Sequence, residues 1–211
     1  MYFVAGLFIT FEGPDGSGKT TIASLVVEEL KNKGKDVVLT REPGGIEIAE
    51  QIRKIILDPS NTAMDERTEA LLYAAARRQH LIEKVLPALK ENKIVICDRF
   101  VDSSLVYQGK GRGIGIDKVY DMNLFAIEGI MPDFTIFFDI DPKLGLARTK
   151  KDNNRVLDRL DLEDLSFHQK VYEGYKEVVE KYKDRIISID ASKSIEEVKN
   201  DVLKLIEDHL K

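Results

Sequence analysis

The stretch that decides the fold is Gly13-Pro14-Asp15-Gly16-Ser17-Gly18-Lys19-Thr20. It satisfies the pattern G-x-x-x-x-G-K-[ST], directly after the apolar run 7–11 and directly before the helical pattern 19–33. Glycines in this pattern let consecutive backbone N–H groups converge on phosphate oxygens at the positive end of a helix. Lys19 can then reach the terminal phosphates, and the Thr20 hydroxyl can ligate Mg²⁺. The stretch therefore predicts a phosphate-binding loop for a nucleoside triphosphate, rather than an ordinary glycine-rich turn.

The sequence on both sides of this loop alternates between strand and helix patterns. Besides 7–11, short apolar and β-branched runs lie at 36–40, 93–97, 134–138 and 186–189. Such alternation indicates an α/β protein with a five-stranded parallel sheet and helices on both faces, here a P-loop NTPase fold. The expected helices are 19–33, 46–57, 65–92 with a bend near Pro87, 102–108, 117–128, 142–150, 162–183 and one that begins with a capping box at Ser194. Segments 109–115 and 149–155 are expected to be loops that are mobile or ordered by a ligand.

Composition limits the domain organisation and the partners. The 211 residues fit one domain, 1–211, at about 100 to 200 residues per domain. Lys plus Arg number 32 against 37 Asp plus Glu, so no overall basic field favours a nucleic acid. The only cysteine, Cys97, has no disulfide partner, and the apolar N-terminal run is too short for a membrane span. We expect a cytoplasmic protein without a membrane anchor and with no nucleic-acid partner.

Two further groups of residues predict a second phosphate site. Thr40-Arg41-Glu42-Pro43-Gly44-Gly45 follows the second strand, and Asp98-Arg99 follows the third. The carboxyl ends of parallel strands border the ligand crevice, so Arg41, Asp98 and Arg99 should face the phosphate loop. Guanidinium groups suit a second phosphate, although a surface ion pair is the commoner fate of a single arginine. The guanine-reading element Asn-Lys-x-Asp does not occur in the chain, which favours ATP as the nucleotide.

Taken together, these motifs resemble those of the bacterial thymidylate kinase family along almost the whole chain. The resemblance is carried by Asp15, by residues 40–45, by Asp98-Arg99-Phe100, by Ser103-Ser104 with Tyr107-Gln108-Gly109, and by Gly111-Arg112-Gly113. It implies the reaction of ATP with dTMP to give ADP and dTDP, with Mg²⁺ as cofactor, in a homodimer. The implied ATP site comprises Gly13, Pro14, Asp15, Gly16, Ser17, Gly18, Lys19, Thr20, Thr21 and Arg148, and the implied metal ligands are Thr20 and Asp98.

The same resemblance assigns an acceptor site. Tyr73 would stack on the pyrimidine and Arg77 would donate to it, while Ser104 and Gln108 would satisfy its imide edge. On chemistry alone, Tyr73 and Arg77 could equally be a core tyrosine beside a solvated arginine. The remaining assignments place Tyr107 under the sugar, Asp15 at the 3′-hydroxyl, and Arg41, Arg53 and Arg99 near the acceptor phosphate.

Catalysis is assigned to Lys19, Arg99 and a cation from a lid segment around residues 148–159. That segment contains Arg148, Lys150, Lys151, Arg155 and Arg159. It departs from the family's Arg-x-Arg-x-Arg pattern, because Lys150 replaces the second arginine and Asp152 the third. Arg155 is the expected transition-state cation, Arg148 should lie against adenine near Ala191-Ser192, and a solvated charged loop is the alternative.

Two other functions remain open at this point. One is a kinase for another nucleoside monophosphate, since only Tyr73, Arg77, Ser104 and Gln108 favour thymidylate. The other is a non-catalytic regulatory protein that binds ATP, for which a second phosphate site would be unnecessary. His80, His168 and His209 lie in none of the motifs, and we assign them no catalytic role.

Overall fold

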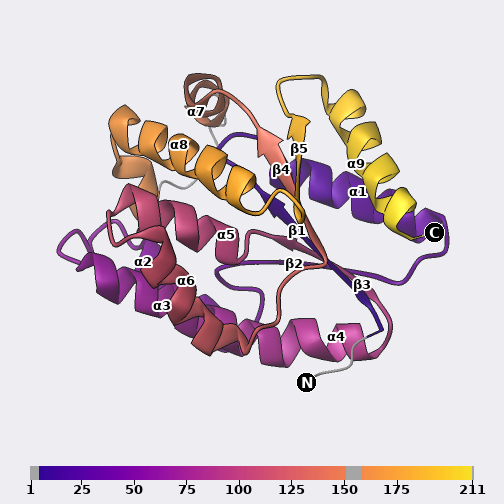
Figure 1. Cartoon of the computed structure of the whole chain (residues 1–211), viewed down its shortest axis with the longest axis horizontal. Coiled ribbons are helices and arrows are strands. Elements are labelled where there is room, and N and C mark those ends of the chain that lie inside the picture. The colour runs from indigo at the N-terminus through magenta and orange to yellow at the C-terminus, as the bar shows by residue number, and fades with distance from the viewer. Residues whose placement is uncertain (1–4, 151–157, 211) are drawn as a thin grey trace.

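Five parallel strands form one sheet in the computed structural model, which describes residues 5–150 and 158–210. The strands are β1 (Leu7–Glu12), β2 (Val37–Arg41), β3 (Ile94–Asp98), β4 (Phe134–Asp139) and β5 (Ile186–Asp190). Their order across the sheet is β2-β3-β1-β4-β5, so β2 and β3 lie on one side of the central strand β1, and β4 and β5 lie on the other (Figure 1). The predicted α/β class and five-stranded parallel sheet are confirmed.

The register of the strands brings their carboxyl ends level. Phe11 of β1 and Arg41 of β2 both pair with Asp98 of β3, so these strands end side by side. Loops that leave a parallel sheet at one level surround a common crevice. The phosphate loop, Arg41 and Asp98-Arg99 are therefore neighbours because of strand register, as predicted.

Helices cover both faces of the sheet. They are α1 (Lys19–Asn32), α2 (Glu47–Leu57), α3 (Glu66–His80), α4 (Leu86–Lys90), α5 (Val101–Ser104), α6 (Ile116–Ile127), α7 (Pro142–Lys150), α8 (Leu165–Lys181) and α9 (Ile195–His209). One apolar core joins α1 and α9 to the sheet through residues such as Val26 and Val202. The other core includes Leu105, Val171 and Tyr175, with α8 across the opposite face (Figure 1). Buried Cys97 belongs to this second core.

Two helical segments differ from the sequence-based expectation because their turns are wide. The helix expected over 65–92 consists of α3, the π-helical segment η1 (Leu81–Val85) and α4, with Pro87 in the first turn of α4. A second π-helical segment, η2 (Leu105–Gly111), continues α5. The loop prediction for 109–115 was therefore wrong at its start, since three of its residues complete this helix. Gly109 and Gly111 permit it, because an added Cβ would lie 3.0 Å from Ile116 and 2.9 Å from the Phe167 ring.

The expected helix 162–183 also begins differently. The 3-10 segment η3 (Arg159–Leu162) comes first, and α8 starts only at Leu165, after Asp164 caps it. The last helix does open with the predicted capping box, in which Ser194 and Glu197 satisfy each other's backbone N–H groups. None of the described helices is long and apolar enough to cross a membrane.

Candidate active site

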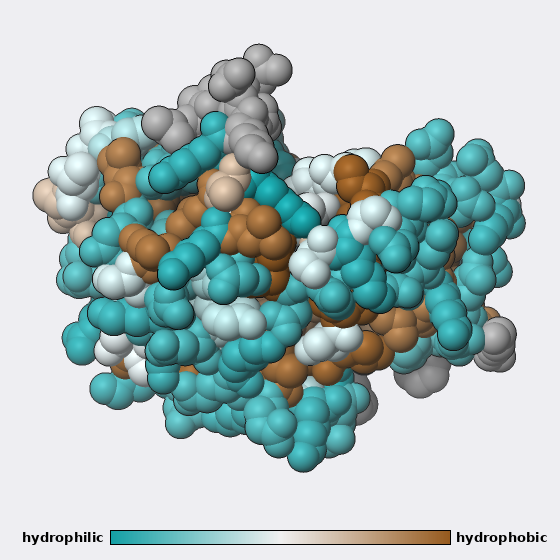
Figure 2. All heavy atoms as spheres, turned by 90° about the horizontal axis from the view of Figure 1, so that it is seen from above, coloured by the Kyte–Doolittle hydropathy of each residue, from teal (hydrophilic) through white to brown (hydrophobic). Residues whose placement is uncertain are grey.

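A cavity of about 850 Å³ opens at the carboxyl ends of the strands. On the face seen in Figure 2, polar side chains predominate and apolar ones show between them. The cavity lining includes the following predicted site residues: Asp15, Gly16, Ser17, Gly18, Lys19, Thr20, Thr21, Arg41, Arg53, Tyr73, Arg77, Asp98, Arg99, Ser104, Tyr107, Gln108 and Arg148. These predicted residues come from seven segments of the chain, around residues 15–21, 41, 53, 73–77, 98–99, 104–108 and 148, and they meet in space. Gly13 and Pro14 do not line the cavity, but their carbonyl oxygens accept hydrogen bonds from Lys19. Arg155 lies outside the described residues.

The phosphate loop holds Lys19 in a fixed position. The Lys19 ammonium donates to the carbonyl oxygens of Gly13 and Pro14, both at 2.9 Å, and to Ser17 Oγ at 3.1 Å. Gly18 has a φ of 87°, no side chain caps the N-terminus of α1, and the residues of its first turn line the cavity. Burial, and then repulsion by Arg99, lower the pKa of Lys19 to about 8. A bound polyphosphate would add negative charge beside Lys19 and raise this pKa.

Thr20 and Asp98 form the candidate metal site. The Thr20 hydroxyl donates to Asp98 Oδ2 at 2.6 Å, and both residues line the cavity. The described residues contain no group of three or more His, Cys, Asp or Glu side chains suited to a metal. A Mg²⁺ ion that is shared with substrate phosphates needs only one or two protein oxygens, with water completing its shell. This pair of oxygen donors therefore fits Mg²⁺ bound together with a nucleotide.

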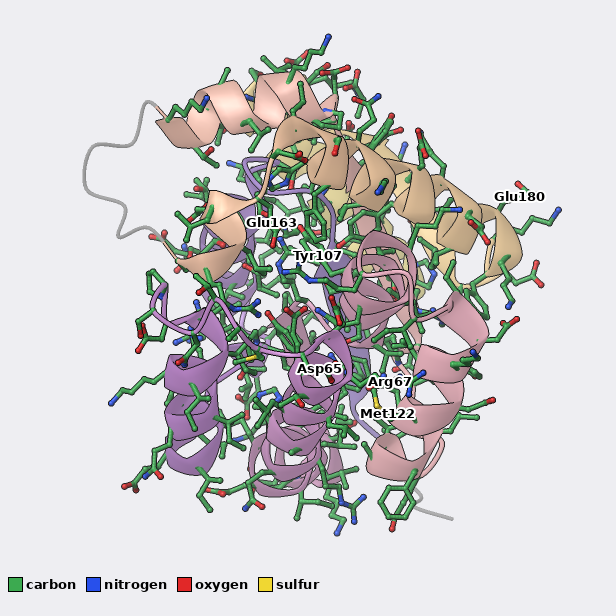
Figure 3. All side chains as sticks on the ribbon, turned by 90° about the vertical axis from the view of Figure 1, so that its left-hand side faces the viewer. Asp65, Arg67, Tyr107, Met122, Glu163 and Glu180 are labelled. Atoms are coloured by element: carbon green, nitrogen blue, oxygen red, sulfur yellow. The ribbon has the colours of Figure 1, made fainter. Side chains whose placement is uncertain are left out.

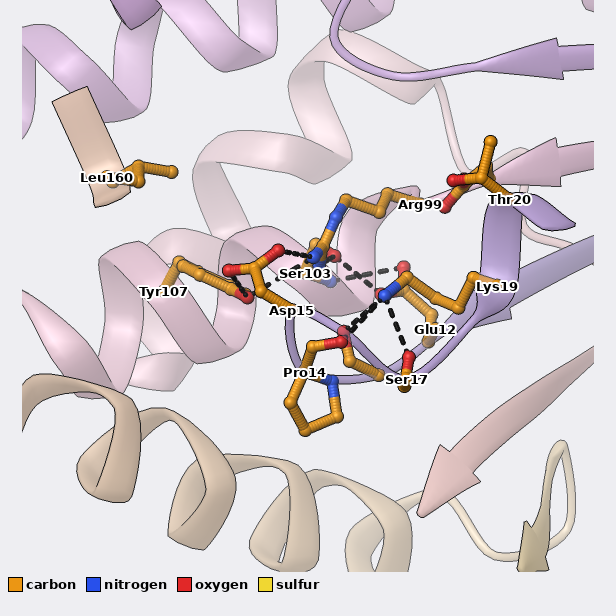
Figure 4. Close-up of polar contacts among 12 residues, drawn as sticks. Glu12, Pro14, Asp15, Ser17, Lys19, Thr20, Arg99, Ser103, Tyr107 and Leu160 are labelled. Carbon is orange, nitrogen blue, oxygen red and sulfur yellow. Dashed lines mark hydrogen bonds and ion pairs between the residues drawn. The ribbon is translucent and has the colours of Figure 1, made fainter. Parts of the chain in front are cut away.

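Arg99 donates hydrogen bonds to side chains of both the phosphate loop and α8, and Figure 4 shows it close to Asp15 and Lys19. Its Nη2 donates to Asp15 Oδ1 at 2.7 Å and to the Tyr107 hydroxyl at 3.3 Å. Its Nη1 donates to Ser103 Oγ at 3.0 Å and to the Tyr175 hydroxyl at 3.2 Å. The alternative of an ordinary surface ion pair does not describe this arginine, because its side chain is largely buried in the cavity wall.

Among the predicted arginines that the structure describes, Arg77 is the most enclosed, with 2 % of its surface exposed. Its guanidinium donates to Glu42 at 2.8 Å, to Ser104 Oγ at 3.1 Å, to the Phe100 carbonyl at 2.9 Å and to Asn123. The alternative of a solvated arginine is therefore wrong. Four contacts leave one of the five N–H groups of a guanidinium for a ligand.

Gln108 is oriented by a carboxylate that the sequence analysis missed. Its Nε2 donates to Glu69 Oε1 at 2.8 Å, and Glu69 is buried. With the amide nitrogen turned to Glu69, the carbonyl oxygen of Gln108 remains available as an acceptor on the cavity side. The signal for Glu69 was present in the sequence: it precedes Tyr73 by four residues and Arg77 by eight, on one face of α3.

Arg41 and Arg53 converge on one backbone carbonyl. Arg41 Nη1 donates to the Pro43 oxygen at 2.8 Å, and Arg53 Nη1 donates to the same oxygen at 3.0 Å. Arg41 also pairs with Glu50 at 2.7 Å, so the ion-pair alternative holds for this arginine in part. Both arginines line the cavity that Arg99 also lines, and they add positive charge to it.

Comparisons with known proteins decide the family. A family model for thymidylate kinase matches residues 11–202. A thymidylate kinase of Geobacillus sp. (strain WCH70) is 62% identical over 193 residues, which are 92% of this chain and 92% of that protein. This chain belongs to the thymidylate kinase family. A thymidylate kinase of Oceanobacillus iheyensis is 56% identical over 98% of this chain and 92% of its own length.

A solved structure of the family agrees with the fold. The crystal structure of thymidylate kinase from Ehrlichia chaffeensis superposes with a TM-score of 0.78 at 34% identity. The match covers 96% of this chain and 99% of that one. The family fold, a P-loop NTPase fold, therefore extends over nearly the whole chain.

Two arginines of the expected lid, Arg148 and Arg159, make hydrogen bonds to the rest of the protein, whereas residues 151–157 lie outside the part of the chain that the structure describes. Arg148, in the last turn of α7, donates to the carbonyl oxygens of Ala191 at 3.0 Å and Ser192 at 3.3 Å. These contacts bring Arg148 to the loop after β5, as predicted from the family. Arg159 was wrongly included among the mobile lid cations, because it is buried and binds the Ile56 carbonyl and Glu69. Lys151 and Arg155 lie outside the described residues.

Proposed function

We propose that this chain transfers the γ-phosphoryl group of ATP to dTMP, giving dTDP and ADP. Membership of the thymidylate kinase family, together with a cavity that holds a phosphate loop and a separate arginine cluster, supports this reaction. The observation that carries the proposal is Arg99, a second cationic group whose Nη2 lies 2.7 Å from Asp15 Oδ1 of the phosphate loop. A protein that only bound ATP would not need a second cationic group at that distance.

The chain's own residues supply alignment and positive charge, which are the main requirements of phosphoryl transfer. Lys19 and the N-terminus of α1 bind the β- and γ-phosphates. Thr20 and Asp98 would hold Mg²⁺, which would shield phosphate charge when bound with ATP. Arg99 binds the acceptor phosphate, with Arg41 and Arg53 beside it. An acceptor phosphate is already anionic at neutral pH, so no general base is assigned.

The acceptor base is read by residues of α3 and η2. Tyr73 stacks on the pyrimidine, Arg77 donates its remaining N–H to a ring carbonyl, and the Gln108 carbonyl accepts the imide N–H. Ser104, which accepts from Arg77, holds that arginine at the base edge. Tyr107 lies under the sugar, where its hydroxyl donates to Asp15 Oδ2 at 3.1 Å. Asp15 in turn accepts the 3′-hydroxyl of dTMP, and Tyr107 excludes a ribose 2′-hydroxyl.

Two lid arginines complete the nucleotide site. Arg148 lies against adenine, since its carbonyl contacts at Ala191 and Ser192 place it beside the loop after β5. Arg155 supplies the transition-state cation. The sequence supports this assignment through Ser17, which stands where some family members carry an arginine in the phosphate loop.

The chain acts as a homodimer through the outer face of α2, α3 and α6. These three helices lie side by side (Figure 3). They expose Ile48, Ile55, Leu71 and Phe125, of which Phe125 is 90% exposed. Isolated apolar residues are common on surfaces, but one exposed phenylalanine and three exposed large aliphatic side chains on neighbouring helices favour a buried interface. Light scattering of Phe125→Glu should show a monomer where the parent chain is a dimer.

A cytoplasmic location and the absence of a nucleic-acid partner remain predictions from composition. They agree with small nucleotide substrates and a buried Cys97 thiol, whose pKa is raised by burial. The net charge of -5 gives the surface no general attraction for a polyanion.

The decisive experiment is a panel of nucleoside monophosphates incubated with ATP and Mg²⁺ and scored for ADP and diphosphate product. Rapid turnover with dTMP alone supports the proposal. Equal or faster turnover with dCMP or AMP would instead identify a kinase for another nucleoside monophosphate. ATP binding without turnover of any monophosphate would identify a regulatory protein.

A further inference from the structure

The two terminal nitrogens of the Arg99 guanidinium, Nη1 and Nη2, bind different partners. Its Nη2 faces the cavity, where it contacts Asp15 and Tyr107. Its Nη1 donates to Ser103 Oγ and to the hydroxyl of Tyr175, which is buried and does not line the cavity. A bound phosphate can compete for Nη2, whereas Nη1 is fixed by the protein. The orientation of Arg99 therefore depends on what holds Ser103 and Tyr175.

Both hydroxyl groups are held by one buried carboxylate, Glu12, at the end of β1. Glu12 Oε2 accepts from Ser103 Oγ at 2.5 Å and from the Tyr175 hydroxyl at 3.1 Å. Glu12 Oε1 accepts from the backbone N–H groups of Phe100 at 2.7 Å and Ser103 at 3.2 Å. Glu12 and Tyr175 are each 1 % exposed, so bulk water does not compete for these bonds. Figure 4 shows Glu12 close to Arg99 and Ser103.

The charge of Glu12 sets the direction of these hydrogen bonds. An ionised carboxylate only accepts, so Ser103 and Tyr175 must turn their hydroxyl hydrogens toward it. Their lone pairs are then available to accept the two Nη1 hydrogens of Arg99. An amide at position 12 could donate to the same hydroxyls, and their hydrogens would then turn toward the Arg99 donors. Only the carboxylate makes both links favourable at once.

Glu12 also stabilises the backbone conformation at Arg99. Arg99 has a φ of 71°, a left-handed conformation that is uncommon for residues other than glycine. The Arg99 N–H donates to the Phe11 carbonyl at 2.9 Å, and the next N–H, that of Phe100, donates to Glu12. Two consecutive residues of β1 thus bind two consecutive N–H groups around the left-handed residue. Strained backbone of this kind persists where its surroundings enforce it.

We propose that Glu12 is a positioning residue that orients Arg99 toward the acceptor phosphate, through Ser103, Tyr175 and the Phe100 backbone. This inference rests on the proposed function, in which Arg99 binds the phosphate of dTMP. Glu12 itself does not line the described cavity. Burial, and then the neighbouring Asp102 carboxylate, raise the pKa of Glu12 to about 7, so ionised Glu12 is unfavourable in the folded chain. A carboxylate kept at such a position indicates a role other than stability.

The test is a double-mutant cycle between Glu12→Gln and Arg99→Ala, measured at pH 8, where Glu12 is ionised. The readouts are dTMP affinity by calorimetry and kcat/KM for dTMP and for ATP. Glu12→Gln should weaken dTMP binding and kcat/KM for dTMP by about 10- to 100-fold, with the ATP affinity nearly unchanged. In the Arg99→Ala background the same change should have almost no further effect on dTMP affinity. An undiminished effect in that background, or no effect in the parent chain, would overturn the inference.

Two outcomes separate this inference from the proposed function. If Arg99→Ala leaves dTMP binding and turnover unchanged, the acceptor role of Arg99 is wrong and the inference is overturned with it. If Arg99→Ala strongly weakens dTMP binding and turnover but Glu12→Gln changes neither, the proposed function stands and only the positioning role is overturned.

Single-hydroxyl variants test the same path if Glu12→Gln fails to fold. Tyr175→Phe and Ser103→Ala each remove one link between Glu12 and Arg99, and each should raise the dTMP Kd several-fold. The matched control is Tyr172→Phe, three residues earlier on α8, whose hydroxyl donates to Asp139 at 2.9 Å away from the cavity. Tyr172→Phe should leave dTMP binding unchanged. Equal effects of Tyr172→Phe and Tyr175→Phe would overturn the inference.

Discussion

The Thr20 hydroxyl donates a 2.6 Å hydrogen bond to the Asp98 carboxylate, which joins the first turn of α1 to the end of β3. In the proposed reaction this pair holds Mg²⁺, with Asp98 acting directly or through water. Asp98→Asn keeps the size of the side chain and removes its charge. The Mg²⁺ concentration for half-maximal rate should rise about 10- to 100-fold, the usual cost of losing a metal-site partner. Mg²⁺ titration of turnover measures it, and an unchanged titration would remove Asp98 from the metal site.

The buried ammonium of Lys19 predicts a pH limit on ATP use. Its pKa is lowered to about 8, so the free enzyme loses this charge as the pH rises through 8. Because kcat/KM reports the free enzyme, kcat/KM for ATP should fall about tenfold per pH unit above that value. When ATP is saturating, bound phosphate keeps Lys19 protonated, so kcat/KM for dTMP should not fall as the pH rises through 8. Profiles from pH 6.5 to 9.5 measure both, and identical profiles for the two substrates would contradict the role of Lys19.

Arg99→Ala should impair the use of dTMP and leave the binding of ATP nearly unchanged. A charged contact in a desolvated site is worth about 2 to 5 kcal/mol, so kcat/KM for dTMP should fall by orders of magnitude. ATP affinity should change little, since Lys19 and the α1 N-terminus hold the triphosphate. Steady-state kinetics and ATP calorimetry measure the two effects. A collapse of ATP affinity with normal acceptor kinetics would contradict the two-site arrangement.

The fold and most of the site could be predicted because their signals are local in sequence. Short β-branched runs, the phosphate loop and the Ser194 capping box each depend on neighbouring residues, and strand register then brings Arg41 and Asp98 together. The wide turns of η1 and η2 could not be predicted, since local sequence patterns do not distinguish a π-helix from an α-helix; in η2 only the folded chain shows that a Cβ at Gly111 would lie 2.9 Å from the Phe167 ring.

Buried carboxylates were the part of the site that sequence reasoning missed. Glu12 adjoins the phosphate loop, but its partners Ser103 and Tyr175 lie 91 and 163 residues away. Glu69 likewise meets Gln108 and Arg159 only in the folded chain. Sequence patterns identify groups that touch a ligand by their motifs, whereas the groups that orient them are defined by long-range contacts.

The lid predicts different kinetic effects for two arginines. Arg148 beside adenine would contribute equally to the ground and transition states, so Arg148→Ala should raise the ATP KM and leave kcat nearly unchanged. Arg155 is assigned to charge that develops in the transition state, so Arg155→Ala should lower kcat on the order of 10²-fold or more, with little effect on KM. Saturation kinetics for both substrates measure these effects. If Lys150→Ala or Lys151→Ala lowers kcat instead, another cation of the lid is the donor.

The orientation of Gln108 predicts which bases the enzyme accepts. Because its amide nitrogen is bound to Glu69, its carbonyl oxygen must accept from the base, which suits the imide N–H of thymine and uracil. Cytosine presents a lone pair at that position, so dCMP should react about 10³-fold or more slowly than dTMP. Gln108→Ala removes the acceptor, and the ratio of kcat/KM for dTMP over dCMP should then narrow by about tenfold. The dTMP over dUMP ratio is the internal control and should stay constant, because both bases carry the imide. A constant dTMP over dCMP ratio in Gln108→Ala would show that another residue reads the base edge.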